Sequence, residues 1–319
     1  MQHWTVGDVD IHAVLQAIIP IPASRLFAAA PERFADDSLT DYCDASGNIL
    51  MAIQSFLIVS GQDRVLVDTC FGDSFLRSRQ IPDRFAESLA ATGFRPDDIT
   101  AVVCTHLHRD HAGGNTVQRA GQWVPAFAGA DYLVTAAEHE HWCDFTGEDR
   151  VAPECVAPLQ QYGRLRLIEP DHRVTGDIRL VPTAGHTPGH VSVRIESGGS
   201  ARLDGGEVKL GPPHERGGSA RLDGGEVKLG PPHERAGAVA YISGDVIHHP
   251  AQIGDPGICA LPDADPTAAR ASRLQLLRRV ADERALLLGS HFAAPSGGYV
   301  NSADDRLAWQ PLVEREGAR

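Results

Sequence analysis

A short run of histidines with one aspartate, THLHRDH at positions 105–111, constrains this 319-residue chain more than any other feature. The run directly follows an apolar segment that is typical of a buried strand. Because alternate side chains of an extended segment share a face, His106 and His108 can point at one metal ion. Asp110 and His111 come where a Gly-rich stretch lets the chain turn into a helix, so they can face a second ion. The spacing therefore predicts a metal site just beyond the end of a strand.

The pattern H-x-H-x-D-H resembles the signature of the metallo-β-lactamase superfamily, and three further parts of that family's pattern can be found. Gly185–His190 resembles its G-H-T-P-G-H element, Ser243–Asp245 resembles its G-D element, and Ser290–Phe292 sits where a final strand delivers the last histidine. The resemblance implies seven ligands in two groups, with His106, His108 and His186 on one metal, Asp110, His111 and His291 on the other, and Asp245 bridging them.

The fold implied by the resemblance is an αβ/βα sandwich, an α/β class in which two mixed β-sheets flanked by helices pack face to face. Apolar or alternating runs independently predict strands at Ile53–Val59, Arg64–Asp68, Ala101–Cys104, Tyr132–Val134, Leu165–Ile168, Ile178–Pro182, Val191–Ile195, Val239–Ile242 and Leu286–Leu288. Helical patterns fall at Asp83–Thr92, Thr135–Cys143 and Pro266–Glu283. The last has Asp265 as its N-cap and an apolar face of Leu274, Leu277 and Val280. We expect residues 1–319 to form a single layered domain.

Residues 198–216 recur without a change as residues 217–235. Two copies of a Gly- and Pro-rich segment are too few and too polar to stack as a solenoid, so we interpret 198–235 as an inserted, flexible, solvated loop. A role in binding is the alternative. The loop joins a strand that leaves the metal edge to one that returns to it, which predicts a position remote from the reaction.

The composition narrows the partners and the compartment. A formal net charge of −13 disfavours binding to nucleic acid or to an anionic membrane surface. The six cysteines form no C-x-x-C pair, and no secretion signal or membrane-spanning stretch is visible. We therefore expect a cytoplasmic protein with reduced thiols and a small-molecule substrate, and a homodimer is compatible with this.

Imidazole and carboxylate donors suit two Zn²⁺ ions, although Mn, Fe or Co can bind the same donors. The sequence looks most like the lactonase and methyl-parathion-hydrolase-like branch, which implies a bridging hydroxide that opens a lactone or similar ester, with Asp110 and Asp245 as catalytic carboxylates. Hydrolysis of a phosphotriester or a glyoxalase II-like thioester is the alternative. A mononuclear iron persulfide dioxygenase is the alternative from another class.

Four more residues are candidates for the pocket or for support of the ligands. Asp68 lies in a V-D-T element that resembles the family's V-D-T-G, and we expect it to hold ligands in place. His190 is interpreted as a supporting or turn residue rather than a pocket residue. His248 and His249 follow Asp245 closely, and they either line the pocket or belong to a loop.

Overall fold

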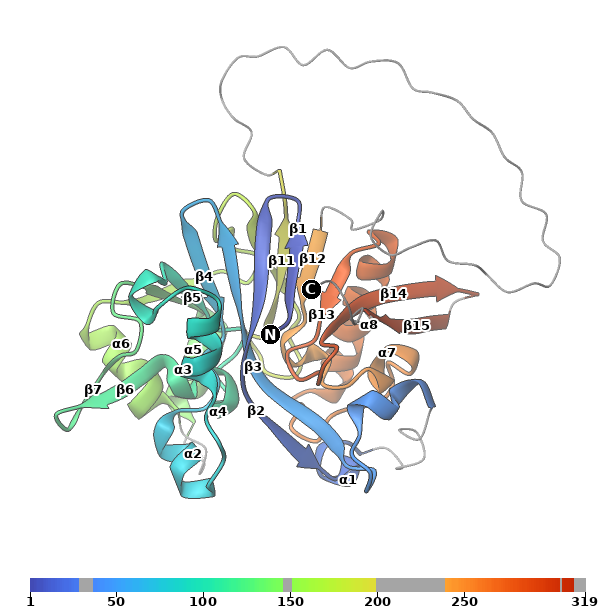
Figure 1. Cartoon of the computed structure of the whole chain (residues 1–319), viewed down its shortest axis with the longest axis horizontal. Coiled ribbons are helices and arrows are strands. Elements are labelled where there is room, and N and C mark those ends of the chain that lie inside the picture. The colour runs from blue at the N-terminus through green and yellow to red at the C-terminus, as the bar shows by residue number, and fades with distance from the viewer. Residues whose placement is uncertain (29–36, 146–150, 199–238, 305, 313–319) are drawn as a thin grey trace, which may run out of the picture.

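The computed structural model describes residues 1–28, 37–145, 151–198, 239–304 and 306–312 (Figure 1). Apart from Gly198, the predicted repeat loop 198–235 lies outside these residues. The single-domain prediction for the whole chain likewise stays a prediction.

Fifteen strands and eight α-helices are formed by the described residues, with short 3₁₀ turns between some of them. The strands are β1 His3–Val6, β2 Val9–Ile21, β3 Ile49–Ser60, β4 Asp63–Val67, β5 Ala101–Val103, β6 Thr116–Arg119, β7 Gln122–Pro125, β8 Asp131–Thr135, β9 Leu165–Ile168, β10 Ile178–Pro182, β11 Val191–Glu196, β12 Val239–Ile242, β13 Leu286–Leu288, β14 Gly297–Ala303 and β15 Arg306–Pro311. The helices are α1 Ala23–Leu26, α2 Asp73–Arg79, α3 Phe85–Ala91, α4 Arg109–Ala112, α5 Ala136–Asp144, α6 Ala157–Gln161, α7 Ala251–Gly254 and α8 Pro266–Asp282.

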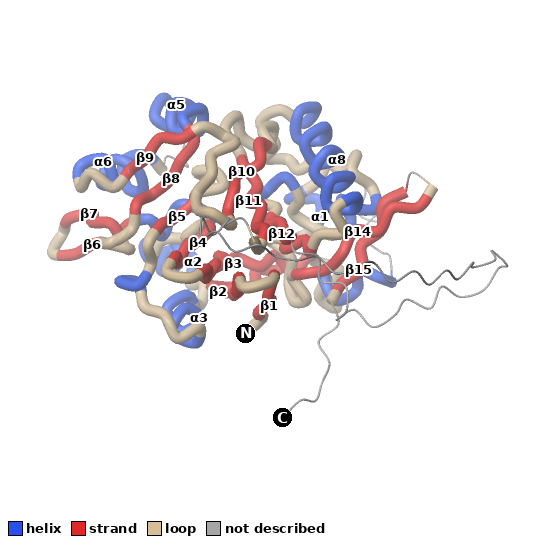
Figure 2. The backbone as a smooth tube through the Cα atoms, turned by 90° about the horizontal axis from the view of Figure 1, so that it is seen from above, coloured by secondary structure: helices blue, strands red, loops and turns tan. Residues whose placement is uncertain are grey.

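Thirteen of these strands form two mixed sheets that pack face to face between helices, as predicted, and β6 and β7 form a separate two-stranded sheet. The first has the order β1-β2-β3-β4-β5-β8-β9, and the second has the order β10-β11-β12-β13-β14-β15. Strands β4, β5, β8 and β9 pair in parallel, as do β12 and β13, and the remaining pairs within the two sheets are antiparallel. Helices α3, α5 and α6 lie beside the first sheet and α8 lies beside the second (Figures 1 and 2).

The alternation of side chains along each strand accounts for these layers. In β4, Val65 and Val67 belong to the apolar cluster between the sheets, whereas Leu66 packs into the cluster under the helices of the first sheet. In β13, Leu288 faces the other sheet and Leu287 packs toward α8. Because neighbouring side chains point to opposite faces, apolar runs without alternation build a sheet that is buried on both sides.

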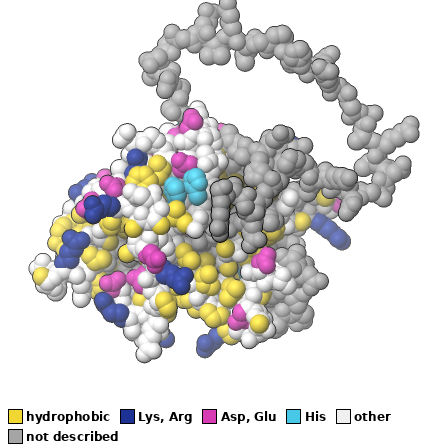
Figure 3. All heavy atoms as spheres, viewed as in Figure 1, with side chains coloured by type: hydrophobic (Ala, Val, Ile, Leu, Met, Phe, Trp, Pro, Cys, Tyr) yellow, Lys and Arg dark blue, Asp and Glu magenta, His cyan; other side chains and the backbone are white. Residues whose placement is uncertain are grey.

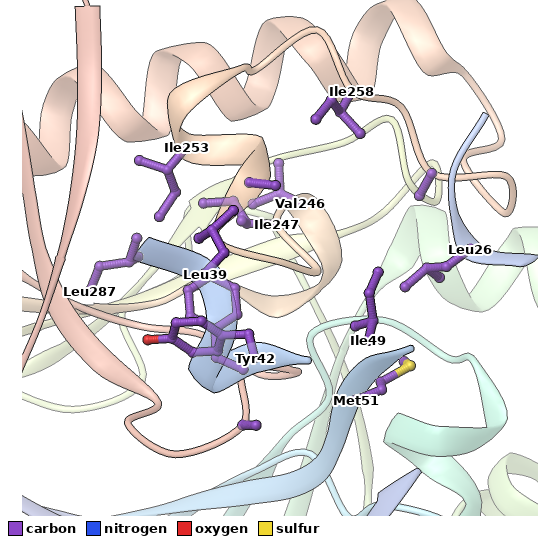
Figure 4. Packing of buried hydrophobic residues seen from close by; sticks show 14 of the residues in the cluster. Leu26, Leu39, Tyr42, Ile49, Met51, Val246, Ile247, Ile253, Ile258 and Leu287 are labelled. Atoms are coloured by element: carbon purple, nitrogen blue, oxygen red, sulfur yellow. The ribbon is translucent and has the colours of Figure 1, made fainter. Parts of the chain in front are cut away.

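The core beneath α8 extends to the segments that surround the predicted metal edge. Figure 4 shows Leu39 and Tyr42 from the N-terminal region packed beside Val246 and Ile247, which directly follow the predicted bridging carboxylate. Tyr42 is 1% exposed, and its hydroxyl donates to the carbonyl of Pro295 at 3.0 Å. The N-terminal region therefore forms part of the wall of the metal edge.

The long helix begins as predicted, since the carboxylate of Asp265 accepts hydrogen bonds from the backbone of Thr267 and Ala268, both at 3.0 Å. Its predicted apolar face was partly wrong. Leu276 is buried where Leu274 is only half-buried. The fully packed face also includes the charged side chain of Arg273, whose hydrogen bonds are described below.

Several strands went unpredicted. The run Val9–Ile21 forms β2, and the strand that delivers the last predicted histidine is not the final one, because β14 and β15 follow it. The segment 18–50 starts and ends within the long strands β2 and β3. Both β1–β2 and β14–β15 are hairpins, and β1 and β15 are sheet edges.

The surface mixes the two signs of charge. Lys, Arg, Asp and Glu side chains are interspersed on the face in Figure 3, which also carries hydrophobic patches. No helix within the described residues is long and apolar enough to cross a membrane. All six cysteines lie in the described ranges and none is in a disulfide, as expected.

Candidate metal centre

The predicted ligands come from loops at a single edge of the sandwich. His106 and His108 follow β5, and Asp110 and His111 lie in α4, the short helix that comes next. The other three follow strands of the second sheet, with His186 after β10, Asp245 after β12 and His291 after β13. Strands of both sheets therefore end where the two sets of ligands meet.

The first group contains His106, His108, His186 and Asp245, which are able to hold one metal ion. His108 Nδ1 lies 2.9 Å from His106 Nε2 and 2.9 Å from His186 Nε2. Ring nitrogens spaced in this way converge on one point, since zinc bonds to imidazole of about 2.0–2.1 Å bring ligand nitrogens to about this separation.

The second group contains Asp110, His111 and His291. The Nε2 atoms of the two histidines are 3.1 Å apart, and Asp110 Oδ2 lies 3.6 Å from His291 Nε2. Asp245 faces both groups. Its Oδ1 is 3.0 Å from each Nε2 of the second group, and its Oδ2 is 3.5 Å from His186 Nε2.

The outward-facing ring nitrogens identify which atoms point inward. Nδ1 of His111 bonds Asp68 at 2.8 Å, Nδ1 of His186 bonds Asp263 at 2.9 Å, and Nδ1 of His291 bonds the carbonyl of Ala52 at 2.8 Å. Acceptors on Nδ1–H leave the Nε2 lone pair directed at the centre, which is the arrangement that metal-binding histidines adopt. The donor set therefore fits two ions of the zinc type.

Burial and neighbouring charges set the protonation of these groups. Burial lowers the pKa of His106 and of His186 well below the ordinary value, which keeps both rings neutral and able to bind a metal. At His111, burial opposes the charge, but Asp245 and Asp68 outweigh it and raise the pKa well above the ordinary value. For Asp245, burial is likewise outweighed, and the cationic neighbours hold its pKa well below its usual range.

Asp68 and His190, two of the residues predicted to support the ligands, both form hydrogen bonds with ligand residues. Asp68 is 1% exposed and accepts hydrogen bonds from the backbone and the hydroxyl of Thr105 at 2.7 and 2.8 Å, in addition to His111. His190 accepts the backbone N–H of Asp245 at 2.8 Å and contacts Thr183 at 2.9 Å, so it supports the bridging carboxylate from behind.

The two histidines after Asp245 differ in position. His248 Nε2 lies 3.2 Å from Asp245 Oδ2, and its ring stacks 5.8 Å from that of His291 at an interplanar angle of 8°. The ring of Phe27 packs edge-on against it at 6.2 Å. His249 instead turns toward Tyr42, 5.9 Å away between ring centres. His248 therefore belongs to the centre, and His249 to the adjoining core.

Two buried residues at the centre were not predicted from the sequence. Asp263 holds His186 and lies 3.6 Å from Arg273, which also donates to the carbonyls of Val246 and Ile258. Glu138 accepts hydrogen bonds from the backbone N–H groups of Leu107, in the loop after β5, and of Gly189, in the loop that carries His186. Its T-x-x-E spacing was a visible signal, but only of a helix start.

An αβ/βα sandwich with two adjoining histidine and carboxylate groups at one edge defines a metal-dependent enzyme of the hydrolase type. The family model described as the metallo-β-lactamase superfamily matches residues 50–291. The chain belongs to this superfamily and is one of its metallo-hydrolases.

Similar proteins point the same way. An N-acyl homoserine lactonase of Bacillus sp. is 29% identical over 188 residues, which cover 54% of this chain and 69% of the relative. The N-acyl homoserine lactonase AttM of Rhizobium radiobacter is 29% identical over 117 residues, covering 34% of this chain and 40% of that one. The resemblance to lactonases predicted from the motifs is thus confirmed.

Solved structures match the fold over nearly the whole chain. The hydrolase AbOPH of the β-lactamase superfamily aligns with a TM-score of 0.74 at 21% identity, covering 98% of each chain. AidC, a dizinc quorum-quenching lactonase in complex with a product, aligns with a TM-score of 0.73 at 19% identity, covering 99% of this chain and 98% of that one. These likenesses confirm the predicted fold.

Proposed function

We propose that this protein is a dinuclear zinc hydrolase that opens the ring of N-acyl homoserine lactones or closely similar lactones. The observation that carries the proposal is the position of Asp245 between two adjoining ligand groups. Its Oδ1 lies 3.0 Å from both histidines of the second group, and its Oδ2 lies 3.5 Å from His186 of the first group and 3.2 Å from His291 of the second. The lactonase relatives supply the substrate class. The substrate is a small molecule, and no nucleic acid or membrane partner is needed.

A zinc pair held by the two ligand groups would supply a hydroxide near neutral pH, the nucleophile that lactone hydrolysis requires. The protein's own groups prepare the centre for this. Asp245 joins the two ligand groups, and His190 fixes its backbone from behind. Both side chains are buried and held by hydrogen bonds, which favours a preorganised site.

Asp110 is the carboxylate placed to handle the proton. Its side chain is 19% exposed, whereas those of Asp245, His111 and His291 are at most 4% exposed, so it lies at the open side of the centre. A carboxylate at the mouth can orient the nucleophile and later deliver a proton to the leaving alkoxide. We therefore expect Asp110→Asn to bind zinc and to lose most of its kcat, by about 10²-fold or more.

His248 is placed to contact the substrate. The side chain is buried, its Nε2 lies 3.2 Å from Asp245 Oδ2, and its Nδ1 has no hydrogen-bond partner within the described part of the chain. An imidazole N–H at this position can donate to the carbonyl oxygen of the lactone. We expect His248→Phe to raise KM, while zinc binding is retained.

The deciding experiment is acid release in a pH-stat with the full chain, in zinc-loaded and chelator-stripped forms. The panel contains homoserine lactones with acyl chains of different length, a phosphotriester and a glutathione thioester. Zinc-dependent ring opening that Asp110→Asn abolishes supports the proposal. Zinc-dependent turnover of only the phosphotriester or the thioester would transfer the assignment to that substrate. Bound iron with oxygen consumption on a persulfide would replace hydrolysis by the dioxygenase alternative.

A further inference from the structure

Helix α5 passes beside the first ligand group and carries two buried side chains one turn apart, Glu138 and Trp142. The helix begins at Thr135, whose hydroxyl accepts the backbone N–H of Glu138 at 3.3 Å. In a T-x-x-E capping box the glutamate normally turns back to the N-cap backbone. Glu138 is instead 1% exposed, and its carboxylate bonds two other segments of the chain. The local capping interaction has been exchanged for a tertiary one.

The carboxylate of Glu138 joins the two histidine loops of the first group. Oε1 accepts the backbone N–H of Leu107 at 2.9 Å, and Leu107 lies between the two histidines of the first loop. Oε2 accepts the backbone N–H of Gly189 at 2.9 Å, in the loop that carries His186. A Cβ added to Gly189 would overlap the backbone nitrogen of Glu138, so the two segments are in close contact. One buried carboxylate thereby sets the spacing of the loops.

His108 is the ligand that most needs this support. The other four histidines of the two groups each use their second ring nitrogen in an outward hydrogen bond. For Nε2 of His108, the described residues offer no such partner. Its ring instead packs edge-on against Trp142, with centroids 5.2 Å apart and an interplanar angle of 77°. Glu138 in turn accepts the indole N–H of Trp142 at 2.7 Å.

We propose that Glu138 and Trp142 are positioning residues for His108, and that they set the metal affinity of the first ligand group without touching the metal or the substrate. Glu138 holds the backbone on one side of His108, and Trp142 holds its ring. The inference rests on the ligand groups of the proposed function, but not on its substrate.

The test measures zinc affinity in the full chain, by competition with a chromophoric chelator. Glu138→Gln keeps the size of the side chain and replaces one acceptor oxygen by an NH₂ group that faces a backbone N–H. The substitution is combined with His291→Ala to measure the zinc affinity of the first group alone, and with His186→Ala to measure that of the second. The control is Glu140→Gln, an exposed position on the same helix.

We expect Glu138→Gln to weaken zinc at the first group by about 10–100-fold and to leave the second group unchanged. Trp142→Phe should weaken the first group in the same direction by a smaller factor. Equal loss at both groups, or no loss at either, overturns the inference. If circular dichroism shows that Glu138→Gln does not fold, Trp142→Phe decides, and an unchanged affinity overturns it. If the wild-type chain binds no zinc, the proposed function is overturned as well. If the wild type binds zinc and the Glu138 and Trp142 variants bind it with the same affinity, this inference alone is overturned.

Discussion

Asp68 controls the tautomers of two ligands, so its replacement by asparagine is expected to separate metal binding from folding. Its carboxylate accepts three hydrogen bonds, from the Thr105 backbone, the Thr105 hydroxyl and His111 Nδ1, at 2.7–2.8 Å. In Asp68→Asn the amide oxygen can keep the first of these. The NH₂ group then faces the other two partners, and both must become acceptors.

The consequence reaches both ligand groups. His111 satisfies the new donor only by carrying its proton on Nε2, the nitrogen that faces the centre. The Thr105 hydroxyl turns to donate to His106 Nδ1, 3.1 Å away, which moves the His106 proton to Nε2 as well. Since the amide keeps partners for its hydrogen bonds but no longer carries the charge that faces His111, we expect the unfolding free energy to fall by about 3 kcal/mol. Zinc affinity should fall by about 10–100-fold at each group.

Chelator competition and urea unfolding of the metal-free protein measure the two effects separately. Asp97→Asn, at an exposed aspartate, serves as the control. Asp68→Ala leaves buried donors unpaired, and it should lose about 3–5 kcal/mol of stability as well. Wild-type zinc affinity in a folded Asp68→Asn protein would refute this account of the centre.

Three further changes test other parts of the structure. Burial lowers the pKa of His249 from 6.5 to about 4, so the unfolded chain binds more protons between these two pH values, and the folded state loses stability as the pH falls through them. Over this interval the wild type should lose about 3 kcal/mol more unfolding free energy than His249→Gln, as measured by urea unfolding at each pH. Gly185 has a φ of +136°, and an added Cβ would overlap the backbone of Ala269. Gly185→Ala should therefore lower the unfolding free energy by about 3 kcal/mol and weaken zinc binding through His186. Equal thermal stability of the wild type and Gly185→Ala would contradict this. Deletion of residues 217–235 should leave kcat within about twofold, because β11 ends at Glu196 and β12 begins at Val239, both away from the centre. Lost turnover in a folded deletion variant would favour the binding role of the repeat.

The parts of the molecule that the sequence predicted well are those in which one local pattern decides the outcome. The histidine and aspartate ligands lie at set spacings after apolar strands, and the structure brings all seven together. The central strands were found because side chains buried on both faces leave continuous apolar runs. The hairpins β1–β2 and β14–β15 were missed, since polar residues within them, such as His12 and Asn301, interrupt the apolar pattern.

The residues that the sequence did not disclose owe their roles to partners far away in the chain. Arg273 is a charged residue of the kind that a sequence pattern assigns to solvent, yet its guanidinium donates to three backbone carbonyls and lies beside Asp263. Asp263 is 77 residues from His186, the ligand that it orients. A buried charge is tolerated only when such partners surround it, and those partners are known only once the fold is. In this centre, therefore, local motifs predict the metal ligands and Asp68, whereas Asp263, which fixes the tautomer of His186, becomes visible only in three dimensions.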